Sequence, residues 1–178
     1  MEKVGAEYLR VVRQNFLDLK KLGDRTFAQL PDADFYAQPD RESNSIAVVI
    51  RHLHGNMASR FTDFLTTDGE KPGRNRDGEF ESANQSRDEL VERWETGWQI
   101  VMKALDSLDE ADLLRTVLIR NQPLSVIEAL NRQVSHYGYH VGQIVFLAKH
   151  RRAANWKTLS IPRAGSVEFN REFGKQAP

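Results

Sequence analysis

The sequence predicts an all-α protein, a four-helix bundle with a small hairpin or irregular insert before the last long helix. Two observations lead to this prediction. Four long segments repeat apolar residues at three- and four-residue steps, which is the period of an amphipathic helix. No segment shows the alternation of strands and helices that is typical of a parallel sheet. The length of 178 residues suggests one domain over 1–178, large enough to bury a core without disulfides.

The first two helices are expected over residues 4–29 and 46–66. In the first, charged residues separate the apolar ones, and Pro31 stops the helix. The second has an apolar stripe from Ile46 to Phe64. Three residues that precede it can act as its N-cap: Ser43, Asn44 and Ser45.

Gly55 interrupts the second helix. A glycine inside a helix costs up to about 1 kcal/mol relative to alanine, so its presence indicates that another group packs closely there. The residues that follow Thr67, 68–78, contain three glycines, a proline and many charges. We expect them to form a long exposed loop, and such loops often border functional sites.

The third helix is expected to begin with a capping box of Ser86 and Glu89 and to end near Ser107. Its Trp94 and Trp98 are spaced one turn apart, which suits either the core or a dimer interface better than a stacking platform. A short turn of helix is expected between this helix and residue 114.

Residues 116–123 are expected to form a short strand and a turn, in a small hairpin. The fourth helix begins with a second capping box, Ser125 with Glu128, and runs to His150. The tail, 153–178, has little apolar periodicity and is expected to be irregular.

Composition excludes several classes of protein. The chain has 25 basic and 25 acidic residues, interspersed along its length, so no strong field favours nucleic acid or anionic lipid. It has no cysteine, which excludes disulfides, thiolate ligands and a cysteine nucleophile. No apolar run suggests a membrane span or a signal peptide. We therefore expect a cytoplasmic protein that binds neither membranes nor nucleic acids.

Two histidines in the fourth helix suggest a metal site. His136 and His140 are four residues apart, so they lie on one face of the helix and can hold one ion. A third imidazole can come from His52 or His54 in the second helix. These two point to opposite sides of the apolar stripe, and periodicity alone does not choose between them. His150 is expected to be a solvated residue of the last helical turn.

Three neutral imidazoles can hold a divalent ion and leave a coordination position open for a reactant. Such a ligand set suits zinc, nickel, copper or ferrous iron, and we expect zinc or nickel first. Asn56 and Gln143, each about one turn from a histidine, can orient a ligand or take part in a polar contact between helices. Arg60 can bind an anionic substrate or lie in solvent.

Two motifs carry a resemblance to a known superfamily. The segment RHLHGN, residues 51–56, and the segment HYGYHVGQ, residues 136–143, resemble the DinB-like superfamily, which includes YfiT-like metal-dependent hydrolases. Within it, the chain is similar to a subfamily of unknown function. The resemblance implies a four-helix bundle, often a homodimer, whose metal ligands would be His52, His136 and His140. His54 lies where the pattern does not require histidine.

The resemblance also implies a class of reaction. Characterised members of the superfamily include S-transferases and isomerases that use low-molecular-weight thiols. We therefore expect a metal-dependent enzyme that activates water or such a thiol, a hydrolase or a thiol S-transferase acting on a small-molecule substrate. The alternative is a noncatalytic bundle that binds a metal or a partner in a stress response.

Overall fold

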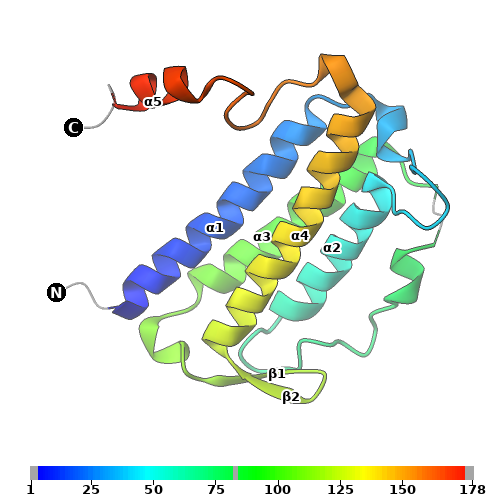
Figure 1. The fold of residues 1–178 in the computed structure, drawn as a ribbon. Helices are drawn as coiled ribbons and strands as arrows, with labels where there is room; N and C mark the ends of the chain where they lie inside the picture. The colour runs from blue at the N-terminus through cyan, green and yellow to red at the C-terminus, as the bar shows by residue number, and fades with distance from the viewer. Residues whose placement is uncertain (1–3, 82–83, 175–178) are drawn as a thin grey trace.

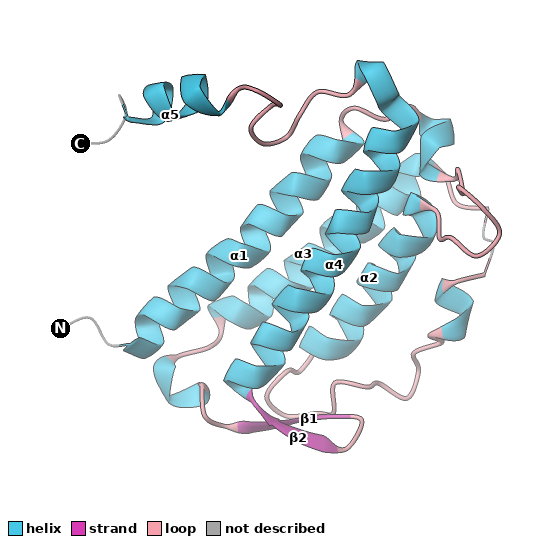
Figure 2. Ribbon diagram, viewed as in Figure 1, coloured by secondary structure: helices cyan, strands magenta, loops and turns pink. Residues whose placement is uncertain are grey.

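The computed structural model describes residues 4–81 and 84–174. It is mostly helical, with one two-stranded sheet, which confirms the predicted fold class (Figure 2). Five α-helices are present: α1 (Val4–Phe27), α2 (Ile46–Phe61), α3 (Arg87–Asp106), α4 (Val126–Arg152) and α5 (Ser166–Gly174). Four short 3-10 helices lie in the connections: Asp32–Phe35, Asp77–Glu79, Glu110–Asp112 and Ala153–Asn155.

The first four α-helices form the bundle. Helix α2 packs against α3 and α4, and α1 packs against α4. Figure 1 shows that α2 and α3 run in the same direction, as do α1 and α4, while α2 and α4 are antiparallel. The connection between α2 and α3 must therefore return along the length of the bundle. The four helices thus form a bundle with one crossover connection.

The predicted caps are present. Ser45 caps α2 through its side chain, which accepts from the amide of Val48. Ser86 with Glu89 and Ser125 with Glu128 form the capping boxes of α3 and α4. In each box the two side chains accept hydrogen bonds from two backbone N–H groups that a helix start leaves unpaired.

The predicted hairpin is also present. Strand β1 (Thr116–Ile119) pairs antiparallel with β2 (Gln122–Ser125), and Ile119 faces Gln122 in the register. Arg120 and Asn121 join the strands with positive φ angles of 56° and 60°. Two such residues form the type I′ turn that matches the twist of a hairpin. The hairpin closes the end of the bundle at which α4 begins (Figure 2).

Helix α2 ends earlier than expected. The sequence suggested residue 66, but the helix ends at Phe61, because Thr62 is extended, with ψ 127°, and Asp63 follows in a left-handed conformation with φ 49°. A left-handed residue just after a helix is a common stop. Phe64 is nevertheless buried, packed from the turn against Phe61 with ring centroids 5.4 Å apart. The apolar character of Phe64 therefore reflects packing in the core and not a position in the helix.

The tail is more ordered than expected. The prediction of an irregular segment over 153–178 was wrong for α5, although residues 175–178 lie outside the described part. Nine residues make only about 2.5 turns, too few for a clear periodic pattern. Phe169 and Phe173 stack one turn apart, with ring centroids at 5.9 Å. Within 4–81 and 84–174, no helix combines the length and hydropathy that crossing a bilayer requires.

An aromatic cluster forms the centre of the core. Trp94 and Trp98 are each 1% exposed, so they belong to the core and not to a surface of α3. Phe16 contacts Phe61 and Trp98, with ring centroids at 6.0 and 6.3 Å. Trp98 in turn contacts Tyr137 of α4, at 5.7 Å. Such edge-to-face contacts lock neighbouring helices in place.

We predict that Gly23→Ala destabilises the protein. A Cβ at this position would collide with the buried ring of Trp94, reaching 2.6 Å from its Cη2 atom. Overpacking of this kind costs about 1–3 kcal/mol, or about 2–4 °C in Tm for each kcal/mol at this chain length. Gly142→Ala is the matched control, because a Cβ there meets no atom within 4 Å. Thermal unfolding that lowers the Tm of both variants equally would contradict this account.

Candidate metal centre

Two antiparallel helices bring three histidines together. His136 and His140 lie one turn apart on α4, and His52 faces them from α2. The Nε2 atom of His136 lies 3.3 Å from Nε2 of His52 and 3.1 Å from Nε2 of His140. His52 is 4% and His140 is 9% exposed. The three imidazoles therefore point their Nε2 atoms at one place between the helices.

The other two histidines lie elsewhere. His54 is on the side of α2 that packs against α3, where a Cβ added to Gly97 would lie 3.5 Å from the Cα of His54. His150 is exposed in the last turn of α4. Helix packing therefore brings His52, and not His54, to the pair on α4.

The remaining ring nitrogens have partners that orient two of the imidazoles. His52 Nδ1 lies 2.9 Å from Oε2 of Glu79, and His140 Nδ1 lies 2.8 Å from Oε1 of Gln143. A carboxylate and an amide oxygen can only accept, so each Nδ1 carries the proton and donates. Each Nε2 is then a free lone pair, which is the tautomer that a metal ligand needs.

The geometry fits a divalent ion. Ligand nitrogens at about 2.0–2.1 Å from a tetrahedral zinc ion lie about 3.3 Å from one another, close to the two separations observed. The ligand atoms of all three histidines lie within 4.8 Å of one another. Three histidines leave one tetrahedral position for a reactant. Together they can hold a metal ion.

Burial keeps two of the three histidines, His136 and His140, uncharged. Desolvation, with further contributions from the charges of His140 and His52, lowers the pKa of His136 to about 3. Desolvation also lowers the pKa of His140, although its hydrogen bond to Gln143 acts in the opposite direction. Both imidazoles are neutral at pH 7, so no proton has to leave them before a cation can bind.

Glu79 is a site residue that we did not identify from the sequence. It comes from the connection between α2 and α3, and its side chain is only 10% exposed. Burial would raise the pKa of Glu79, but hydrogen bonds from His52 and Arg74 outweigh it, and the pKa lies below its ordinary value. Arg74 donates to both carboxylate oxygens, at 2.8 and 2.9 Å. Glu79 is therefore a buried carboxylate held between His52 and Arg74.

Gly55 was the one sequence signal that pointed to Glu79. A Cβ at this position would collide with Oε1 of Glu79 and would lie 2.7 Å from its Cδ. Glycine thus gives the carboxylate room to reach His52, three residues earlier on α2. The sequence indicated that some group packs there but did not identify it.

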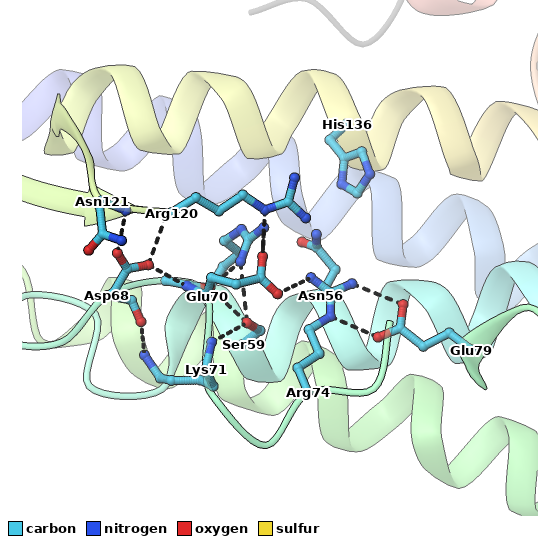
Figure 3. Close-up of polar contacts among 12 residues, drawn as sticks. Asn56, Ser59, Asp68, Glu70, Lys71, Arg74, Glu79, Arg120, Asn121 and His136 are labelled. Atoms are coloured by element: carbon cyan, nitrogen blue, oxygen red, sulfur yellow. Dashed lines mark hydrogen bonds and ion pairs between the residues drawn. The ribbon is translucent and has the colours of Figure 1, made fainter. Parts of the chain in front are cut away.

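A polar network holds the connection that carries Glu79 (Figure 3). Asp68 accepts from the amides of Arg120 and Asn121 in the hairpin turn, at 2.8 and 2.7 Å. Glu70 accepts from Arg120 Nε at 2.8 Å and from Arg60 Nη2 at 3.0 Å. The connection is thus tied both to the hairpin and to α2, and it is less exposed than the sequence suggested.

The three residues predicted to support the site differ in their contacts. Gln143 contacts His140 as described. Asn56 is buried and accepts a hydrogen bond from the hydroxyl of Tyr137, at 3.1 Å, which makes it a polar contact between α2 and α4. Arg60 is 5% exposed and donates to the carbonyl of Gly69 and to Glu70. Its guanidinium binds the connection, which leaves substrate binding by Arg60 a prediction without a supporting contact.

We predict that metal-free protein loses stability as the pH falls below about 6.5. His136 has its ordinary pKa in the unfolded chain and a pKa of about 3 when folded, so the unfolded state binds more protons across this window. The urea midpoint should fall between pH 7.5 and pH 5.0. The fall should be smaller in His136→Asn, which has no imidazole at this position. An equal fall in both proteins would show that burial of His136 does not cause the dependence.

We also predict that Glu79→Ala weakens metal binding by about 10–100-fold, the usual effect of losing a group that orients a ligand histidine. Competition with a chromophoric chelator for Zn²⁺ measures this affinity. Glu81→Ala is a control, because Glu81 is an exposed acid two residues further along the same connection. Equal zinc affinity in wild type and Glu79→Ala would rule out a role for this carboxylate.

Comparison with known proteins places the chain in one family. The family model described as "Protein of unknown function (DUF1572)" matches residues 3–165. This range includes the three histidines, Glu79 and Gln143, and it ends just before α5. No curated protein sequence matches the chain. Because the model covers most of the sequence, the chain belongs to the DUF1572 family, whose function is unknown.

Proposed function

We propose that His52, His136 and His140 hold a divalent metal ion, zinc or nickel, and that the protein is a metal-dependent enzyme. The observation that carries this proposal is the convergence of three Nε2 atoms on one place. His136 and His140 are neutral, and His52 and His140 are oriented by hydrogen bonds at Nδ1. A bound ion of this kind acts as a Lewis acid and makes water or a thiol a stronger nucleophile at neutral pH. The resemblance to the DinB-like superfamily supports the same ligand set.

The residues of the chain set the environment of such an ion. Glu79 accepts a hydrogen bond from Nδ1 of His52, and Gln143 accepts one from Nδ1 of His140. Neither imidazole therefore has to rotate when a cation binds. The carboxylate of Glu79 also places a negative charge behind His52, which strengthens it as a ligand. Partial burial reduces the competition of bulk water with the reactant.

The proposed reaction class rests on the resemblance to the DinB-like superfamily, with which the open ligand set is compatible. We propose hydrolysis of a small molecule or transfer of a low-molecular-weight thiol to an electrophile. For thiol chemistry the thiol must come from outside, because the chain has no cysteine. We further propose that the protein works in the cytoplasm as a homodimer, which sizing chromatography with light scattering can test. Trp94 and Trp98 are buried within the monomer, so another surface would form that interface.

We predict that each of His52→Ala, His136→Ala and His140→Ala loses the metal. Removing a ligand should cost more affinity than the roughly 10–100-fold effect of losing an outer partner. Metal content of the purified proteins, measured by plasma mass spectrometry, tests this directly. The matched control is His54→Ala, which changes the same residue type two positions along α2 and should keep the metal. Retention of metal by all three ligand variants would reject the site.

Catalysis is tested separately from metal binding. Wild type and His136→Ala should be compared in two panels, one of a thiol with electrophiles and one of esters and amides. A rate that depends on both the metal and His136 supports an enzyme. Metal binding with no such rate in either panel would favour the noncatalytic metal-binding bundle.

A further inference from the structure

A groove of about 750 Å³ is lined in part by Gln143, the hydrogen-bond partner of His140. It is bounded by the connection before α2, by α2 and by the second half of α4. Two of its aromatic residues are well exposed, Tyr139 at 64% and Phe146 at 69%. Val49 and Leu147 form its apolar floor. This volume is within the range of pockets that bind small molecules.

The groove continues the seam in which the histidines lie. Val49 is three residues before His52 on α2, and Gln143 is three residues after His140 on α4. Because these helices are antiparallel, both steps lead in the same direction along the bundle (Figure 1). The groove therefore begins about one helical turn from the histidines, at Gln143 and Leu147, which share their face of α4.

Gln143 belongs to both the groove and the histidine group. Its Oε1 accepts from His140 Nδ1, so the orientation of its amide is determined. Its NH₂ group then points away from the imidazole and donates to no residue within 4–81 and 84–174. A residue that lines the groove thus has a donor available for a ligand.

The rim of the groove is acidic. Asp40 and Glu42 are the charged residues among those that line it, and Arg41 between them does not line it. Amides and the hydroxyl of Ser43 donate to the Asp40 carboxylate and lower its pKa, so it is ionised at neutral pH. Two carboxylates beside an apolar floor repel an anion and tolerate a neutral or cationic group.

We propose that this groove binds the substrate of the histidine site, and that the substrate is an uncharged or cationic compound with an aromatic or branched aliphatic group. The apolar group lies against Phe146, Tyr139 and Leu147, and a hydrogen-bond acceptor of the substrate accepts from Gln143. This orientation directs the polar part of the compound toward the histidines. The inference rests on the proposed function and adds the substrate class to it.

Two probes with the same ring skeleton test the proposal. N-phenyl-1-naphthylamine is uncharged, and 8-anilino-1-naphthalenesulfonate adds one sulfonate. In fluorescence titrations of the zinc-loaded protein, the uncharged probe should have a Kd lower by about 3–10-fold, a difference that decreases at high salt because exposed charges are screened. Glu42→Gln should reduce the preference, since it removes one rim charge. Tighter binding of the sulfonate would overturn the assigned substrate class.

Two variants in the groove and one control elsewhere test where the uncharged probe binds. Phe146→Ala should weaken binding of the uncharged probe by about 5–10-fold, because it removes an aromatic contact. Gly142→Phe should also weaken it, because a side chain there has open space and projects into the groove. The control is Ile100→Ala, which alters a separate cavity of about 370 Å³ lined by residues 61–66 and α3. Loss of binding in Ile100→Ala, or unchanged binding in both groove variants, would overturn the proposal.

A cobalt-loaded sample links the groove to the metal. Paramagnetic Co²⁺ should enhance the relaxation of the bound probe's protons in wild type, and His136→Ala should abolish this effect. Metal-loaded protein without the enhancement would overturn the link between groove and site, while leaving the metal site intact. Protein that binds the probe at Phe146 but takes up no metal would instead reject the proposed function. Metal content therefore distinguishes the two failures.

Discussion

The rest of the structure depends on one constraint: three imidazole nitrogens share one small, mostly buried space. Lone pairs at 3.1 and 3.3 Å repel one another unless a proton or a cation lies between them. A neutral imidazole has only one N–H, so a proton on one Nε2 atom has to be shared between two neighbouring lone pairs. A divalent cation satisfies all three at once. The fold must therefore hold these side chains in an arrangement that the repulsion between their lone pairs disfavours.

The support for this arrangement comes mainly from a connection between helices. Glu79 orients His52, and Arg74 neutralises the buried charge of Glu79, which would otherwise be costly. The connection is held in turn by Asp68 at the hairpin and by Arg60 on α2 (Figure 3). Gly55 leaves the space in which the carboxylate sits. The hairpin, the connection and a single glycine thus act together on one imidazole.

The two ends of the histidine group differ in character. Toward the hairpin lie buried arginines paired with Glu70 and Glu79, whose charges are used within the protein. Toward the other end lies the open groove, with aromatic side chains and an acidic rim. In the proposed mode of binding, a ligand that enters the groove meets apolar surface first and the histidines next. This asymmetry defines one side of the histidine group from which a ligand would approach, which a symmetric cluster of histidines would lack.

Local features determined much of the fold from the sequence alone. The capping boxes at Ser86 and Ser125, the hairpin after Thr116 and the pair His136 and His140 all depend on residues a few positions apart. Their geometry follows from the period of a helix or the shape of a turn, and both can be predicted from the spacing of nearby residues.

The tertiary structure decided what depends on distant residues. The choice of His52 over His54 required the rotation of α2 about its axis, which packing against α3 and α4 sets; the resemblance to a known superfamily, and not periodicity, had indicated it. The position of Glu79 depended on the path of a connection, because Glu79 is 27 residues away in the sequence from the imidazole that it orients. Helical periodicity describes one helix at a time. It contains no information on which face meets which neighbour, because that is determined by the packing of all the helices together.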